Sequence, residues 1–286
     1  LTRGTKKHSA EQLAAAVENL GASLNASGGR NSLLLEGKSL KADFPALLAL
    51  AAEVLAEPTF PAGEMEKRRV ARLADLESIK EDSWRLSGRQ LYQILFAGHP
   101  YARDPLGTEA SLKKLTPDDL RSFHRRTVRP GNLVLAVTGD VTLAEAQAEV
   151  ERALAKFFKD DAPFAPPAVP APPPLAAGRR DVTTRPELRD AVFRLAWRAA
   201  SVNDPDRAAL DVLAAALDGM GNRLFTEVRE KRGLAYAVGC YNFPPLDTGA
   251  FIVYGGVKPE NVGEAVRLCL AEFRQVAEKG LEPDEL

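Results

Sequence analysis

The stretch RLFTEVREKRGLAYAVG, residues 223–239, passes from a charged helical run directly into a strand of small and apolar residues. The same order occurs near the beginning of the chain, where LGASLNA (20–26) follows a helical run whose start is marked by Ser9. Sequence similarity between two halves of a chain is the sign of a repeated structural unit. We therefore expect tandem copies of one α+β domain.

A second pair of segments supports the repeat. NLVLAVTGDV (132–141) is mostly apolar, which predicts a strand, and Thr142 with Glu145 then marks a helix start. In the second half, FIVYGGV (251–257) is likewise a predicted strand followed by a helical run. Each half should thus hold a mostly antiparallel sheet packed with helices.

Helix and turn signals place the other elements. Ser9 and Gln12 have the spacing of a capping box, and Thr116 precedes a proline at the first helical position. A glycine pair between two apolar runs indicates a hairpin. We expect hairpin strands at 22–27 and 32–40, and helices at 43–55 and from about Glu64 to Phe96.

Proline marks the boundary between the two halves. Seven of the chain's 20 prolines lie between Pro163 and Pro174, a composition that favours an extended linker over a helix or a central strand. We predict a first domain at 1–160, a linker at 161–180 and a second domain at 181–286. Because the chain begins without methionine and stops at LEPDEL, we expect a fragment that lacks the N-terminal part of the first domain and the C-terminal part of the second.

Composition excludes several classes of protein. The net charge is −1, and no basic patch of the kind that binds nucleic acid is present. No apolar run approaches the roughly 20 residues that cross a bilayer. Cys240 and Cys269 are too few for a disulfide framework. We expect a soluble protein of the cytoplasm or the periplasm, a compartment that the sequence leaves open.

Histidine spacing gives no metal site. His8, His99 and His124 are the only histidines, and none of them lies in an HxxH, HExxH or HxxEH motif. We therefore expect this chain to bind no metal and no other cofactor.

The motif S-R-L-F-x-E-V-R-E-x-x-G-L-A-Y is closely matched by residues 222–236, and it resembles the second domain of the pitrilysin/insulinase family of zinc metallopeptidases. The first half is similar to that family as well, through LTRGTKKHSAEQLAAAVENLGASLNA, EPTFPAGEMEKRRV, GHPYARDPLGTEASLKKLTPDDLRSFH and RPGNLVLAVTGDV, in this order. The resemblance covers nearly the whole chain. It implies one half of a clam-like chamber in which a peptide binds in extended form.

In this family an HxxEH motif supplies two zinc ligands and a catalytic glutamate, and a glutamate on a later helix supplies the third ligand. The HxxEH motif would precede Leu1. Family chains read E-x-x-x-V-x-x-E near the third ligand, and here Glu66 and Val70 match while Leu73 stands at the ligand position. A leucine side chain cannot coordinate zinc. The resemblance thus implies a non-catalytic half without a zinc site, in which no residue is catalytic.

The non-catalytic partner in the family's two-part enzymes carries an arginine and a tyrosine seven residues apart, and Arg229 and Tyr236 match this pair. The resemblance implies that both bind substrate and complete the site of a zinc-bearing partner, as a heterodimer or as halves of one polypeptide. A plain alternative is a surface ion pair for Arg229 and rim packing for Tyr236.

Two other functions stay open. One is a truncated catalytic chain that uses Asp75 or Glu77 as the third zinc ligand. The other is a purely structural member of the family, similar to the core subunits of the respiratory cytochrome reductase. The structural alternative predicts that Arg229 and Tyr236 can both be lost without an effect on peptidase activity.

Overall fold

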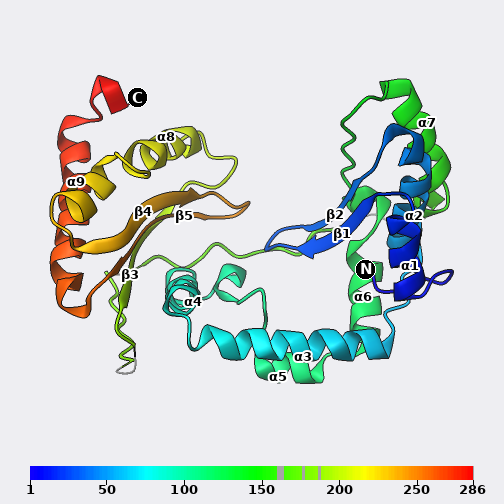
Figure 1. Cartoon of the computed structure of the whole chain (residues 1–286), viewed down its shortest axis with the longest axis horizontal. Helices are drawn as coiled ribbons and strands as arrows, with labels where there is room; N and C mark the ends of the chain where they lie inside the picture. Colours follow the sequence, from blue (N-terminus) through cyan, green and yellow to red (C-terminus); the bar gives the residue numbers. More distant parts are fainter. Residues whose placement is uncertain (160–163, 176–177, 186–187, 286) are drawn as a thin grey trace. The chain divides into compact units, whose positions relative to one another are not determined.

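A computed structural model describes residues 1–159, 164–175, 178–185 and 188–285 (Figure 1). The chain forms two compact units. The first is made of Leu1–Leu76 and Pro105–Pro167, and the second of Glu77–Asp104 and Ala168–Leu286. Each unit combines helices with an antiparallel sheet, so the predicted α+β class is confirmed.

The second unit takes in a segment from the first half of the sequence, Glu77–Asp104. The boundaries at 160 and 181 stay a prediction about how the two repeats are joined. Residues 161–163 and 176–177 of the expected linker lie outside the described part of the chain.

In the first unit, a small hairpin packs against helices. Helix α1 (Ala10–Glu18) begins at the predicted capping box, in which Ser9 Oγ accepts the N–H of Gln12. Strands β1 (Ser23–Gly28) and β2 (Leu33–Lys38) are antiparallel, as predicted. A buried cluster then joins the C-terminal part of α2 (Phe44–Ala56) to the end of α7 (Leu143–Leu154), through Ala52, Leu154 and Phe157.

Threonine caps start three other helices of this unit. The hydroxyls of Thr108, Thr116 and Thr142 accept backbone N–H groups at the beginning of α5 (Glu109–Lys114), α6 (Pro117–Thr127) and α7. Each cap is reciprocal, because the third residue of the helix bonds back to the threonine N–H. Short 3₁₀ turns lie before α2 at Lys41–Asp43, between α6 and α7 at Pro130–Asn132, and after α7 at Phe157–Lys159.

Two predictions about single elements were wrong. The segment 132–141 is not a strand: among the described residues it forms no ladder, and Val134 is 94% exposed. An apolar run prefers an extended backbone, but a strand needs a neighbour for its N–H and C=O groups. The long helix expected from Glu64 to Phe96 is two helices, α3 (Ala62–Ile79) and α4 (Ser83–Leu95). Asp82 separates them, since its Oδ1 caps α4.

The second unit is built on a three-stranded antiparallel sheet. Its order is β3 (Ala191–Ala199), β5 (Gly249–Val257) and β4 (Ala235–Phe243), so β5 is central. Helices α8 (Arg207–Leu217) and α9 (Val262–Lys279) cover one face, and α4 covers the other (Figure 1). The remaining short helices are the π-helix η5 (Phe225–Glu230) and 3₁₀ turns at Pro100–Ala102, Pro259–Asn261 and Pro283–Glu285.

Side chains along β5 point alternately to the two faces of the sheet, and both faces are covered by helices. Phe251, Val253 and Val257 are buried under α8, η5 and α9, whereas Ala250 and Ile252 are buried against the end of α4. A strand with both faces covered is apolar throughout, which explains why FIVYGGV has few polar side chains. Among the helices that the structure describes, none is both long and apolar enough to cross a membrane.

Candidate functional site

Arg229 is exposed at the end of the π-helix η5. Val228 in this helix and Leu224 just before it hold the segment against the sheet, and both are fully buried. The guanidinium carbon of Arg229 lies 4.8 Å from the centre of the Phe225 ring, within the range of a cation–π contact. Its side chain is therefore directed by an aromatic neighbour, and its donors stay accessible.

Tyr236 lies at an irregularity in β4. Ala235 is opposite Val257 and Ala237 is opposite Gly256, so Tyr236 is an extra residue on the β4 side of the ladder. Such a bulge bends the strand and redirects a side chain. Ala235 is buried in the core, while Tyr236 is 45% exposed on the face that α4 covers.

The ring of Tyr236 lies against Gly256 and Trp84. A Cβ added at Gly256 would stand 2.5 Å from the Tyr236 hydroxyl oxygen and 2.7 Å from Cζ2 of Trp84. The Trp84 and Tyr236 rings meet edge to face, with centroids 6.2 Å apart and planes at 81°. The absence of a side chain at residue 256 thus makes room for the phenol.

Trp84 is held in turn by Arg194 on β3. The guanidinium of Arg194 lies over the indole, 5.9 Å from its centre, and Nη2 donates a hydrogen bond of 3.1 Å to the Trp84 carbonyl. Nε of Arg194 donates to Ser87 Oγ at 3.0 Å. The Tyr254 ring packs edge to face with the same indole at 5.9 Å.

Arg229 and Tyr236 have separate surroundings. Across the described residues, no hydrogen bond or ring contact joins the two side chains. Between them the chain turns at Gly233, whose N–H donates to the Arg229 carbonyl at 2.9 Å and whose φ is +62°. The segment from Arg229 to Tyr236 therefore runs from the end of η5 to the bulge near the start of β4.

Trp84, Arg194 and Gly256 were not among the residues predicted from the sequence. One signal was present, because a glycine inside an apolar strand often marks close approach of another group. No local pattern connects Trp84 to Tyr236, since they are 152 positions apart in the sequence (236 − 84). Their contact depends on how α4 packs on the sheet.

The residues around Leu73 do not fit a zinc ion. Leu73 is half-buried on α3 and its side chain has no donor atom. Asp75 and Glu77, the alternative ligands, are exposed and lie 3.7 Å and 2.5 Å from Arg72 and Lys80. In the described part of the chain, no group of three or more His, Cys, Asp or Glu side chains could hold a metal.

The three histidines take structural positions. His8 is hydrogen-bonded to the buried carboxylate of Glu53 at 2.9 Å, and His124 to the backbone carbonyl of Leu55 at 2.9 Å. His99 is 3% exposed. Burial lowers the pKa of both His99 and His124, so each favours the neutral ring.

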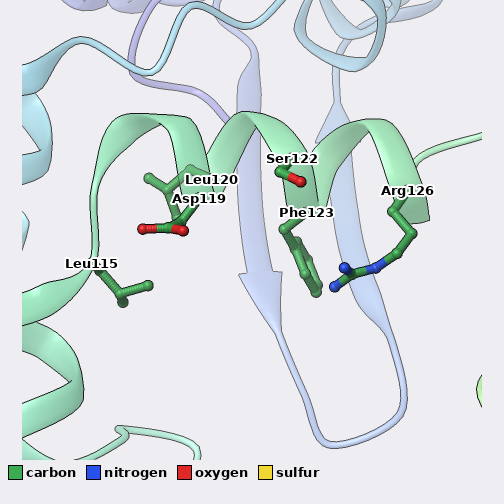
Figure 2. A pocket seen from close by; sticks show the side chains of 6 residues that line it. All are labelled: Leu115, Asp119, Leu120, Ser122, Phe123 and Arg126. Carbon is green, nitrogen blue, oxygen red and sulfur yellow. The ribbon is translucent and has the colours of Figure 1, made fainter.

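A shallow depression of about 390 Å³ lies along one face of α6 (Figure 2). Two of its polar side chains have contacts within α6 and its cap: Asp119 accepts the Thr116 N–H, and Arg126 lies 5.7 Å from the centre of the Phe123 ring. The complete lining is Leu115, Asp119, Leu120, Ser122, Phe123 and Arg126. Neither Arg229 nor Tyr236 lines this depression.

Family comparison agrees with the motifs. The model of the peptidase M16 inactive domain matches residues 114–286, and that of insulinase (peptidase family M16) matches residues 1–109. An uncharacterized zinc protease of Streptomyces coelicolor is 32% identical over 294 residues, covering 100% of this chain. Another, of Rickettsia bellii, is 25% identical and covers 97%. The chain spans 63% and 66% of the lengths of these two relatives.

Solved structures show the same fold. The crystal structure of a peptidase M16 inactive domain from Pseudomonas fluorescens has a TM-score of 0.90 and 27% identity, covering 99% of this chain and 69% of that one. A protease from Helicobacter pylori has a TM-score of 0.79 at 22% identity, which bears on the fold alone. The resemblance inferred from the sequence is thereby confirmed, and the chain belongs to peptidase family M16, the insulinase family.

Proposed function

We propose that this chain is a non-catalytic, substrate-positioning half or subunit of an M16 zinc peptidase, which completes the hydrolysis site of a zinc-bearing partner. The observation that carries the proposal is the placement of Tyr236. Its ring lies between Gly256 and Trp84, and its side chain is still 45% exposed. A tyrosine that served only packing would not need a bulge to present it.

The chemistry suits a donor held in this way. Hydrolysis of a peptide builds negative charge on the carbonyl oxygen, and a fixed O–H donor stabilises that charge as it develops. Arg229 adds a fork of N–H donors that can bind backbone carbonyls of an extended peptide. Both groups act on the substrate, so neither has to be part of the chain that binds zinc.

Zinc is assigned to the partner. Leu73 provides no ligand atom, and Asp75 and Glu77 are engaged by neighbouring cations. The relatives named zinc proteases are longer than this chain, which is consistent with a metal-binding part elsewhere. The partner can be a separate subunit or another part of the same polypeptide, in the cytoplasm or the periplasm.

The test is an assay of the native complex, purified from source cells through a tag on the full-length protein. We expect Tyr236→Phe to leave assembly intact and to lower kcat on a fluorogenic peptide by about 10²–10³. Tyr241→Phe is the matched control, since Tyr241 lies on the same strand and packs on Tyr254. Wild-type kcat for Tyr236→Phe would refute the role and favour a structural member. One zinc per copy bound to this chain alone would favour the truncated catalytic chain.

A further inference from the structure

We infer that Trp84 and Gly256 are positioning residues, which set where the Tyr236 hydroxyl lies. The inference rests on the proposed function, because it assigns a role to residues that act through Tyr236. It starts from the observation that the exposed Tyr236 side chain, presented by the bulge in β4, packs against Gly256 of β5 and Trp84 of α4. We call these two residues the seat of Tyr236.

Gly256 forms the floor of the seat. Its neighbour Gly255 lies on the opposite face of β5, where an added Cβ would overlap the buried ring of Phe193. At Gly256 the added Cβ would overlap the Tyr236 ring and approach Trp84 Cζ2 to 2.7 Å. The two adjacent glycines therefore make room for different aromatic rings, and residue 256 serves the exposed one.

Trp84 forms the side of the seat. Its indole meets the Tyr236 ring edge to face at 6.2 Å, and it is itself fixed by Arg194 from the far edge strand β3. Since β5 lies between β3 and β4, the indole spans the central strand. A movement of Trp84 would consequently remove the lateral support of Tyr236.

Such support matters because a tyrosine has two side-chain torsions, and a hydroxyl at its end moves several ångströms when they change. A displacement of about 1 Å at a reacting centre can cost about 10²-fold in rate. Gly256→Ala pushes the ring from its floor, and Trp84→Leu removes the lateral contact. Each should misplace the hydroxyl without removing it.

The experiment is a double-mutant cycle on the native complex. In the wild-type background we expect Gly256→Ala and Trp84→Leu each to lower kcat by about 10²-fold. In the Tyr236→Phe background neither should lower kcat further, because there is no hydroxyl left to misplace. Equal losses in both backgrounds would overturn the inference and leave the proposed function standing. A Tyr236→Phe variant with wild-type kcat would instead refute the proposed function, and the inference with it.

Two glycine controls separate positioning from general damage. Gly255→Ala disturbs the same strand on its other face, and Gly263→Ala adds a methyl group that meets nothing within 4 Å. We expect wild-type kcat per assembled complex from both.

Fluorescence gives a readout that does not depend on activity. Residues 1–286 contain two tryptophans, Trp84 and Trp197, so Trp197→Phe leaves Trp84 as the only indole of this segment. In that background Gly256→Ala should increase acrylamide quenching of Trp84, as the phenol moves away. Unchanged quenching, together with unchanged kcat, would show that the seat does not hold Tyr236.

Discussion

Nε2 of His99 lies 3.9 Å from Oδ2 of Asp247, while Nδ1 of the same ring accepts the backbone N–H of Tyr101 at 3.1 Å. Because Nδ1 is an acceptor, the proton of the neutral ring is on Nε2. That nitrogen is buried and has no hydrogen-bond partner among the described residues. Burial lowers the pKa of His99, and the charge of Arg198 adds to this, although Asp247 opposes it.

From this follows a pH dependence of stability. A histidine whose pKa is lower in the folded state binds its proton more readily when unfolded, so the free energy of unfolding falls as the pH drops below about 6.5. The loss is at most about 1.4 kcal/mol per pH unit for each group. Urea unfolding between pH 7.5 and 5.5 should show this loss of unfolding free energy, and the loss should be smaller in the His99→Asn variant. An equal slope in the variant would contradict the assignment, since His124 titrates with the same sign in both proteins.

Both cysteines should resist alkylation in the folded protein. Burial raises the pKa of Cys240 and of Cys269 to about 12, and the thiolate is the reactive form. We expect no adduct by mass spectrometry after iodoacetamide treatment at pH 8, and two adducts after denaturation. Ser27→Cys, at an exposed position of the hairpin, is the positive control. Rapid native labelling of Cys240 would show that the sheet opens.

A glutamate at residue 73 should not create a zinc site. The variant Leu73→Glu adds one carboxylate. The carboxylates closest to it along α3, Asp75 and Glu77, form ion pairs with the side chains of Arg72 and Lys80. Zinc sites of this kind need at least three protein ligands. Metal analysis after dialysis should give well under one zinc per chain. Equimolar zinc would mean that the remaining ligands are present in this chain.

Gly239→Ala should destabilise the second unit. An added Cβ would lie 2.6 Å from the Tyr254 hydroxyl oxygen and would overlap Oδ1 of Asp218. That oxygen accepts the Cys240 N–H at 3.0 Å, so it cannot move without losing the bond. Overpacking of this type costs about 1–3 kcal/mol. Urea unfolding measures this loss of stability, and Gly263→Ala is the control. Equal unfolding midpoints for the two variants would contradict the close packing at Gly239.

Arg229→Ala should affect substrate binding more than folding. The side chain is exposed and its contact is with Phe225, so the midpoint of thermal unfolding should stay near that of the wild type. In the native complex the KM for peptide should rise, because a guanidinium binds carbonyls in the ground state. Arg232→Ala, which loses a surface pair with Glu264, is the matched control. Equal KM values for both variants would remove Arg229 from the substrate site.

Local sequence determined much of the framework. The capping residues Ser9, Thr116 and Thr142 begin their helices where predicted, because a cap is formed within four residues and does not depend on distant contacts. The hairpin around Gly28 was predictable for the same reason. The motif at 222–236 identified the family, and with it the fold class.

Tertiary structure alone decided where these elements pair and what surrounds Tyr236. The segment 132–141 has the composition of a strand but no ladder among the described residues, because strand formation depends on a neighbour. The seat of Tyr236 joins a bulge in β4, a glycine in β5 and an indole on α4. These groups lie far apart in sequence, and they meet because α4 packs across the sheet, driven by burial of its apolar end against β5.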